Sequence, residues 1–284
     1  GLLGAFDADW GLGLGDDERV RLAVAAERSV GIEAGTMDQT VISFAEAGAA
    51  LRLDFAPPGR RTIPIPDSIR LVAADSGRRA PKTGAMRDLY DGRVVAGRVA
   101  AVLLGMAVGS DPGAPPALGR LGDPGSLLDA AVELPETRTA REAARESGAD
   151  VGGLCGLSAR RYGPDLPVPV RATAIHMLSE ARRVDAAEAA IAAGDPDRLG
   201  RLFDESHHSL GRFGVGTPEL DELAHRLRDA GARGARLTGA GGGGYAVAVA
   251  TPDTLGEVAA AGRDFAGAAF EVIPSAGMRW SAAG

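Results

Sequence analysis

The sequence lacks several features that would place a chain in a specialised class. Cys155 is the only cysteine, so the chain can form no intramolecular disulfide and no cysteine-rich zinc site, and a reducing, cytoplasmic compartment is expected. The 31 Lys and Arg residues are outnumbered by 38 Asp and Glu residues, which excludes the basic surface typical of nucleic-acid binding. The longest apolar run, Val99–Val108, has about half of the roughly 20 residues that a membrane helix needs, so no membrane partner is expected.

What remains has the composition of a globular protein. Apolar residues make up 45% and charged residues 24% of the 284 positions, enough for one large domain or two modest ones. Apolar residues recur at helical spacing in the segments 16–30, 86–106, 171–193, 196–210, 218–230 and from 254 onward. Alternating apolar residues predict strands at 40–45 and 50–55, which would form a β-hairpin. Short apolar runs predict two further strands between 61 and 75, one strand on each side of a glycine run, and one strand at 270–273. The pattern predicts a mixed α+β fold, with a domain of residues 1–66 and a second domain of residues 67–284.

The glycine run consists of Gly239, Ala240, Gly241, Gly242, Gly243 and Gly244. Glycine-rich runs are commonly flexible linkers, but here strand-like residues flank the run on both sides. Glycine permits positive φ and a close approach of the backbone to a ligand, most often an anion. The run therefore predicts either a ligand-binding loop or a plain tight turn between two strands.

A second candidate site is the segment Gly35-Thr36-Met37-Asp38-Gln39. A carboxylate held at a junction between elements can take a proton from a hydroxyl group. The alternative is that Asp38 only caps a helix or forms a turn.

Taken together and in this order, the motifs resemble the GHMP small-molecule kinases, and the galactokinase branch in particular. GIEAGTMDQ is similar to the GIMDQ segment of galactokinases, and LTGAGGGGYAVAV is similar to the third signature motif of the superfamily. The segments RATAIHMLSEARRVDAAEAAIAAGD and SHHSLGRFGVGTPELDELAHRLRDAG also resemble galactokinase segments. The resemblance extends from about Leu2 to Met278 and is densest at Gly31–Gln39 and Arg171–Ala250.

This resemblance implies a fold and an activity. The fold would combine the remainder of a ribosomal S5-like N-terminal domain with a ferredoxin-like C-terminal domain that carries extra helices. The activity would be ATP-dependent phosphorylation of a sugar hydroxyl, most simply the anomeric 1-OH. Asp38 matches the acid that faces the attacked hydroxyl, Gly35 matches a glycine beside the sugar, and Tyr90 matches a sugar-contacting tyrosine at a helix start; its alternative is a half-buried packing role. The glycine run would border the phosphate site.

The resemblance is incomplete in two places. The family's metal-binding glutamate matches Ala26 by spacing, and Glu27 stands one residue later, so Glu27 is either a Mg²⁺ ligand displaced by one position or a solvated surface residue. The family's Gly/Ser-rich phosphate loop is absent from the sequence. A preceding quarter to third of a kinase would carry it, unless a partner supplies it or the protein has lost catalysis.

Three functions therefore stay open. The first is a galactokinase-like sugar kinase that uses ATP and Mg²⁺. The second is a non-catalytic sugar or nucleotide sensor built on a kinase fold, and the third is a GHMP kinase for another alcohol, of mevalonate or homoserine type. The identity of the sugar and the oligomeric state cannot be deduced from these residues.

Overall fold

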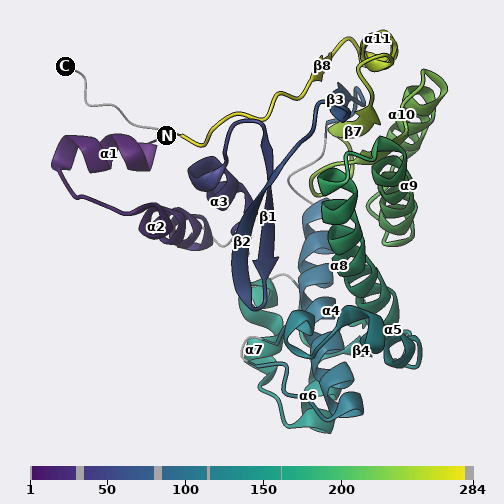
Figure 1. The fold of residues 1–284 in the computed structure, drawn as a ribbon. Coiled ribbons are helices and arrows are strands. Elements are labelled where there is room, and N and C mark those ends of the chain that lie inside the picture. The colour runs from purple at the N-terminus through teal and green to yellow at the C-terminus, as the bar shows by residue number, and fades with distance from the viewer. Residues whose placement is uncertain (1, 30–34, 80–84, 114–115, 161, 279–284) are drawn as a thin grey trace. The chain divides into compact units, whose positions relative to one another are not determined.

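The computed structural model describes residues 2–29, 35–79, 85–113, 116–160 and 162–278 (Figure 1). The chain divides into two compact units. Unit 1 comprises Gly1–Asp54, Pro58–Pro64 and Ile273–Gly284, and unit 2 comprises Phe55–Pro57 and Ile65–Val272. Within the described ranges no helix has both the length and the apolar character required to cross a membrane.

The described residues of unit 1 form three helices and a two-stranded sheet: α1 (Leu2–Trp10), α2 (Asp16–Ser29), α3 (Met37–Phe44), β1 (Ala49–Phe55) and β2 (Pro58–Pro64). The turn between α1 and α2 is held by the buried carboxylate of Asp7. This carboxylate accepts hydrogen bonds from the Leu14 amide at 3.0 Å and from Nε of Arg19 at 3.0 Å. The Leu14 amide, followed by Arg19, lowers the pKa of Asp7, so the carboxylate stays ionised at neutral pH.

The hairpin predicted from segments 40–45 and 50–55 is wrong. Residues 40–44 lie in α3, and β1 pairs instead with β2. The β-branched residues Thr40, Val41 and Ile42 favour strands only weakly, and local contacts together with a distant one, from the Met278 amide to the Ile42 carbonyl, override that preference here. Thr40 donates to the Thr36 carbonyl through both its amide (2.9 Å) and its hydroxyl (2.6 Å), which closes the first helical turn. Strand β2 therefore supplies the partner that the sequence pattern assigned to residues 40–45.

Unit 2 is the larger unit and combines one four-stranded sheet with most of the helices. Its elements are β3 (Arg70–Asp75), α4 (Ala85–Val108), a 3₁₀ turn (Leu118–Arg120), α5 (Pro124–Val132), β4 (Thr137–Thr139), α6 (Ala140–Ser147), α7 (Val151–Cys155), a second 3₁₀ turn (Gly156–Arg160), β5 (Pro167–Pro169), α8 (Val170–Ala192), α9 (Pro196–Arg212), α10 (Pro218–Asp229), β6 (Gly234–Leu237), β7 (Tyr245–Ala250), α11 (Leu255–Ala266) and β8 (Ala269–Glu271). The helices expected at 171–193, 196–210 and 218–230 correspond to α8, α9 and α10.

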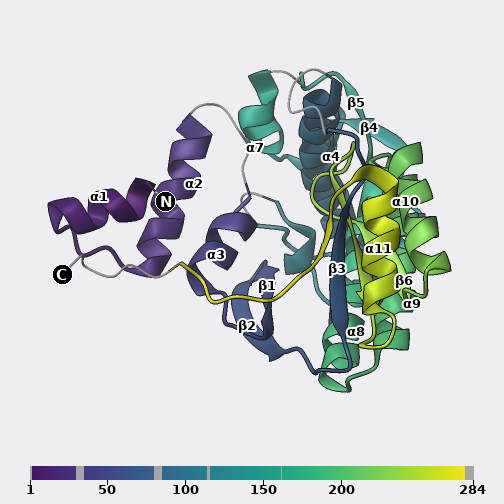
Figure 2. The same cartoon turned by 90° about the horizontal axis from the view of Figure 1, so that it is seen from above.

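The strands of the main sheet follow the order β6-β7-β3-β8, and each neighbouring pair is antiparallel. Strands β7 and β8 are therefore parallel to each other, with β3 between them and α11 as their connection. Helices α10 and α11 pack side by side on one face of this sheet (Figure 2). Their shared core contains the leucines of α10 at helical spacing and alternate residues of the strands: Val72, Ala74, Leu220, Leu223, Leu227, Ala246, Ala248 and Val258.

Helix α9 lies against β6 at unusually short range. A Cβ atom added at Gly234 would come within 1.9 Å of the Gly200 carbonyl oxygen, and one at Gly200 would come within 2.2 Å of the Arg233 carbonyl oxygen. Only residues without a side chain allow this approach. The glycine pair therefore sets the spacing between α9 and the first residue of β6.

A second core joins the long helices α4 and α8 to the shorter elements around them. Val95, Val99 and Leu104 of α4 are fully or almost fully buried, together with Leu154 and Val168. Helices α4 and α8 run side by side (Figure 1). This core is separate from the sheet core, so α8 and α9 connect two apolar clusters within unit 2.

Candidate functional site

The glycine run forms a loop between β6 and β7, which we call the glycine loop (Gly239–Gly244). All five of its glycines have positive φ, a region that other residues rarely adopt. Two factors disfavour a side chain at Gly241: its φ is +78°, and a Cβ atom would lie 2.3 Å from the Val215 carbonyl oxygen. The loop is thus a folded, close-packed bend and not a flexible linker.

Two neighbouring segments of unit 2 hold the glycine loop in place. The Gly242 amide donates to the Val215 carbonyl at 2.9 Å, which attaches the loop to the turn between α9 and α10. The Gly244 amide donates to the Arg78 carbonyl at 2.7 Å, and the Gly244 carbonyl accepts from the Ser76 amide at 2.9 Å. The loop is therefore fixed at its centre and at its end.

Other backbone amides of the loop have no acceptor. The amides of Gly239, Ala240, Gly241 and Gly243 donate no hydrogen bond to any residue in the described parts of the chain. Successive unpaired amides in a bend of alternating conformation form a concave site for anions. The glycine loop therefore has the donors to bind phosphate oxygens.

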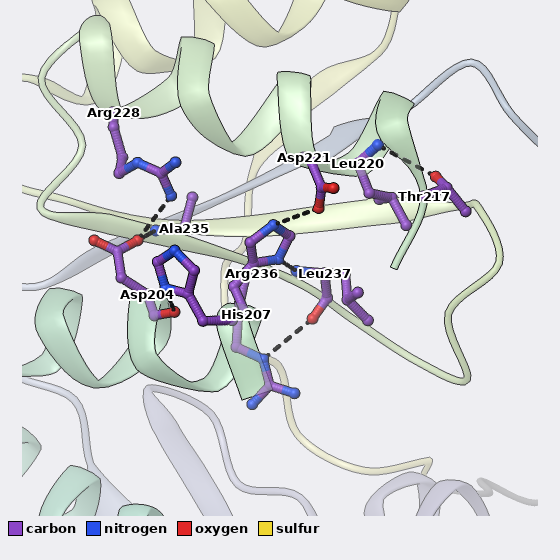
Figure 3. A network of polar contacts seen from close by, with 10 residues as sticks. Asp204, His207, Thr217, Leu220, Asp221, Arg228, Ala235, Arg236 and Leu237 are labelled. Atoms are coloured by element: carbon purple, nitrogen blue, oxygen red, sulfur yellow. Dashed lines mark hydrogen bonds and ion pairs between the residues drawn. The ribbon is translucent and has the colours of Figure 1, made fainter. Parts of the chain in front are cut away.

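Helix α9 covers the outer edge of β6, the strand that leads into the glycine loop (Figure 3). The edge amide of Ala235 donates to Asp204 Oδ1 at 3.0 Å, and the edge amide of Leu237 donates to His207 Nδ1 at 3.2 Å. Asp204 also pairs with Arg228 of α10 at 3.0 Å. Two side chains one helical turn apart thus satisfy alternate amides of an edge strand.

The hydrogen bonds of His207 determine its protonation. Because Nδ1 accepts from the Leu237 amide, the ring proton lies on Nε2, which faces Asp221 Oδ1 at 3.1 Å. Burial lowers the pKa of His207 below its usual value, and Asp221 opposes this shift only in part. A neutral imidazole therefore connects α10, α9 and Leu237, the last residue of β6. The sequence analysis did not assign this role to His207.

Arg78, whose carbonyl anchors the end of the loop, forms an ion pair with α10 through its side chain. Its Nη1 lies 3.0 Å from Glu219 Oε1 at the start of α10. The backbone amide of Glu219, followed by Arg78, lowers the pKa of this carboxyl. Arg78 therefore braces the loop against α10.

The predicted catalytic acid, Asp38, lies in unit 1, in the first turn of α3, and is exposed. Its carboxylate forms no hydrogen bond or ion pair with another residue that the structure describes. Gly35 precedes the helix, and a Cβ atom there would meet no described atom within 4 Å. Within the described part of unit 1, neither the space beside Gly35 nor the Asp38 carboxylate is taken by another residue.

The uncertain metal ligand, Glu27, lies on α2 and joins it to α3. Its Oε1 accepts a 2.8 Å hydrogen bond from Nε2 of Gln39, the residue after Asp38. This bond orients the side-chain amide of Gln39. The Oε1 atom of Gln39 is buried and has no hydrogen-bond partner among the described residues. No cluster of three or more His, Cys, Asp or Glu side chains suited to a metal occurs in the described ranges. Glu27 and the Gln39 oxygen nevertheless offer two oxygen ligands of the kind that Mg²⁺ takes.

The predicted sugar contact, Tyr90, is in unit 2, near the start of α4, with 43% of its surface exposed. The site residues predicted from the sequence are thus divided. Asp38, Gly35 and Glu27 belong to unit 1, and Tyr90 and the glycine loop belong to unit 2.

Comparison with known proteins gives consistent matches. A family model described as GHMP kinases C terminal matches residues 187–267, which contain α9, α10 and the glycine loop. A galactokinase of Chloroflexus aggregans is 33% identical over 248 residues, which are 86% of this chain and 53% of that protein. A galactokinase of Streptomyces coelicolor is 30% identical over 282 residues, or 95% of this chain and 62% of that protein. The chain therefore spans about half to three-fifths of the length of these relatives.

Among solved structures, a Lactococcus lactis galactokinase complexed with galactose matches with a TM-score of 0.65. The match covers 96% of this chain and 62% of the other, at 24% sequence identity. At this identity the match demonstrates a shared fold. The mixed α+β architecture described above is thus shared with that galactokinase structure.

Proposed function

Because this chain belongs to the GHMP kinase family and its galactokinase homologues are about 30% identical over most of its length, we propose that it acts in ATP-dependent phosphorylation of a sugar hydroxyl, most simply the anomeric 1-OH. The observation that carries the proposal is the glycine loop: a fixed bend with four unpaired amides, within the segment that the family model matches. The galactose bound to the Lactococcus lactis galactokinase supports a sugar as the acceptor.

The domain organisation proposed from the sequence agrees with this function. The sheet order β6-β7-β3-β8, with the split connection through α11, supports a ferredoxin-like domain, which we propose for residues 67–284. Its last residues, Ile273–Gly284, belong to unit 1 in the structure. We assign residues 1–66 to the remainder of an S5-like domain. Both assignments are proposals that follow from the family.

Asp38 is the proposed catalytic residue. Its carboxylate accepts the proton of the sugar hydroxyl while the hydroxyl oxygen attacks the γ-phosphorus of ATP, and the bond from that phosphorus to the bridging oxygen of ADP breaks. The exposed carboxylate of Asp38, which no described residue pairs with, is free for this role. Gly35 leaves room for a ligand beside the helix start. The proposed sugar-contacting role of Tyr90 follows from the family resemblance, and 43% of this residue is exposed.

The glycine loop is the proposed binder of phosphate oxygens. Its unpaired amides neutralise charge on the transferred group without the reorganisation that flexible side chains would need. Mg²⁺, when bound, would shield charge on the ATP phosphates. Glu27 would supply one carboxylate oxygen to hold it, with the buried Gln39 oxygen adjacent.

The test uses the full-length protein, Mg-ATP and a panel of free sugars, with release of ADP as the signal. We expect one sugar to be phosphorylated and Asp38→Asn to lower kcat by about 10²- to 10⁴-fold with an almost unchanged Kd for ATP. The matched control is Glu18→Gln, which also neutralises an exposed acid in the first turn of a helix of unit 1.

Three results would contradict the proposal. Normal turnover by the Asp38→Asn protein would remove Asp38 from the mechanism. Binding of sugar or ATP without any turnover would favour a sensor. Turnover with mevalonate or homoserine in place of a sugar would identify a different branch of the family.

A further inference from the structure

Unit 2 contains a cavity of about 500 Å³ that shares no residue with the glycine loop. Three segments line it: the residues around β4, the first turns of α8 and the end of α9. Its volume lies within the range of small-molecule sites in proteins. No role in the proposed kinase reaction requires it.

One wall of the cavity is aromatic and ordered. The His176 ring stacks on Phe213, with 4.1 Å between ring centroids and an interplanar angle of 17°. His176 Nδ1 lies 2.9 Å from the Ser209 hydroxyl, which fixes the orientation of the imidazole. Burial lowers the pKa of His176, so the ring is neutral at pH 7. The Phe213 ring also carries the Arg93 guanidinium, whose Cζ lies 4.4 Å from the ring centroid. With Ile175 alongside, this wall presents aromatic and apolar surface next to a positive charge, which suits a planar ring that bears an anionic group.

The rim of the cavity carries more positive than negative charge. Arg171 is held by a 2.6 Å hydrogen bond from Nε to the Leu134 carbonyl, so its Nη atoms remain available for a ligand. Among the described carboxylates, only Glu136 pairs with Arg171, with 3.9 Å between Glu136 Oε1 and Arg171 Nη1. The Glu136 side chain is 85% exposed. Arg212 is exposed and has no ion-pair or hydrogen-bond partner among the described residues. The rim of the cavity thus carries two guanidinium groups and one carboxylate, although the net charge of the whole chain is −7.

The start of α8 adds to this positive field. Pro169, Arg171 and Ala172 line the cavity, and Pro169 provides no side-chain cap to the helix. The first amides of any α-helix have no intrahelical acceptor and carry partial positive charge. The helix of 23 residues therefore supports the two arginines in attracting an anion.

We propose that this cavity is a second ligand site, which binds a small organic anion composed of a flat apolar ring and one oxyanion group. The ring lies against His176 and Phe213, and the oxyanion accepts hydrogen bonds from Arg171 and Arg212. A free carboxylic acid and a phosphate monoester would both present this chemistry. The site is independent of the proposed kinase chemistry, because neither Asp38 nor the glycine loop contributes to it.

The test is isothermal titration calorimetry of the full-length protein saturated with ATP, so that anion binding at the glycine loop is already satisfied. The probes are benzoate, phenyl phosphate, the neutral isostere benzamide, and inorganic phosphate, which has no ring. We expect benzoate or phenyl phosphate to bind with one-to-one stoichiometry, and benzamide and inorganic phosphate to bind at least about tenfold more weakly.

Two variants locate the binding. Arg212→Gln removes one guanidinium, and Ala172→Glu places a carboxylate in the cavity. Each substitution should raise the Kd of the anionic probe about fivefold or more. The matched controls are Arg201→Gln, an exposed arginine of α9, and Ala189→Glu, an exposed alanine of α8, and both should leave the Kd unchanged. The proposal is overturned if neither anion shows saturable binding, if benzamide binds as well as benzoate, or if Arg212→Gln binds as tightly as Arg201→Gln.

Discussion

The backbone amide of Leu237 donates a hydrogen bond of 3.2 Å to Nδ1 of His207, so a side chain of α9 holds the last residue of β6, two positions before the glycine loop. This hydrogen bond exists only while Nδ1 is unprotonated. A second proton on the ring would place two donors opposite each other and would leave the buried Leu237 amide without an acceptor. The position of the loop is thereby linked to the protonation of one histidine (Figure 3).

This link predicts a dependence of stability on pH. Burial lowers the folded-state pKa of His207, so below about pH 6.5 the unfolded chain binds a proton that the folded chain does not. The free energy of unfolding should therefore fall as the pH is lowered from about 6.5 through the folded-state pKa. His207→Asn, which keeps an acceptor near Nδ1 and does not titrate, should flatten this part of the profile.

His225 provides the matched control, because it is an exposed histidine on α10. We expect His225→Gln to retain the wild-type slope between pH 5 and 7 in urea denaturation. Equal slopes for His207→Asn and wild type would show that His207 does not drive the pH dependence. His176 also has a lowered pKa, so part of the slope should persist in the His207→Asn protein.

A second prediction separates two glycines of the loop that have almost the same φ. Gly239 and Gly241 lie at +77° and +78°, but only at Gly241 would a Cβ atom meet another group, the Val215 carbonyl oxygen at 2.3 Å. Gly239→Ala should lower the free energy of unfolding by about 1 kcal/mol, because alanine is strained at a positive φ. Gly241→Ala should cost about 2–4 kcal/mol, because the overlap adds to the same strain.

Chemical denaturation measures both costs, and ATP binding gives an independent readout. Because Val215 holds the centre of the loop, the Gly241→Ala protein should also bind ATP more weakly than the Gly239→Ala protein. Equal stabilities and equal ATP affinities would mean that the contact between Gly241 and Val215 does not shape the loop.

Much of unit 2 could be predicted from the sequence because its signals are local. Helix α10 begins at a capping threonine followed by proline, with Thr217 accepting a 3.4 Å hydrogen bond from the Leu220 amide, and its leucines recur at helical spacing. The strands before and after the glycine loop can also be predicted from the sequence, since apolar residues flank a continuous turn-forming segment. Such patterns depend on neighbours within a few positions along the chain.

What could not be predicted depends on distant partners. Residues 40–44 have strand-forming side chains but lie in α3, where the carbonyl of Ile42 accepts from the Met278 amide at 2.7 Å. No local pattern reveals that Asp204 and His207 reach the edge amides of β6, about thirty residues away. In the same way, no nearby residue indicates that His207 Nδ1 accepts from the Leu237 amide.

A third prediction concerns the spacing between α9 and β6. Gly234→Ala should cost at least about 1–3 kcal/mol, since its Cβ atom would lie 1.9 Å from the Gly200 carbonyl oxygen and backbone would have to move. Gly256→Ala is the matched control, because Gly256 lies in α11 with no described atom within 4 Å of an added Cβ. That substitution should stabilise the protein by up to about 1 kcal/mol. Thermal unfolding of the two variants should therefore shift in opposite directions, and shifts of the same sign would contradict the close approach.

The last prediction tests the proposed Mg²⁺ ligand. Glu27→Gln removes the negative charge but keeps an oxygen that can accept from Gln39, so α2 and α3 should remain joined and the free energy of unfolding should change little. If Glu27 holds Mg²⁺, the Mg²⁺ concentration for half-maximal turnover should rise at least about tenfold at fixed ATP. Glu18→Gln, on the same helix, should leave that concentration unchanged. An unchanged Mg²⁺ requirement in Glu27→Gln would assign this glutamate to the contact between α2 and α3 alone, and the metal ligand would then have to be supplied elsewhere in the full-length protein.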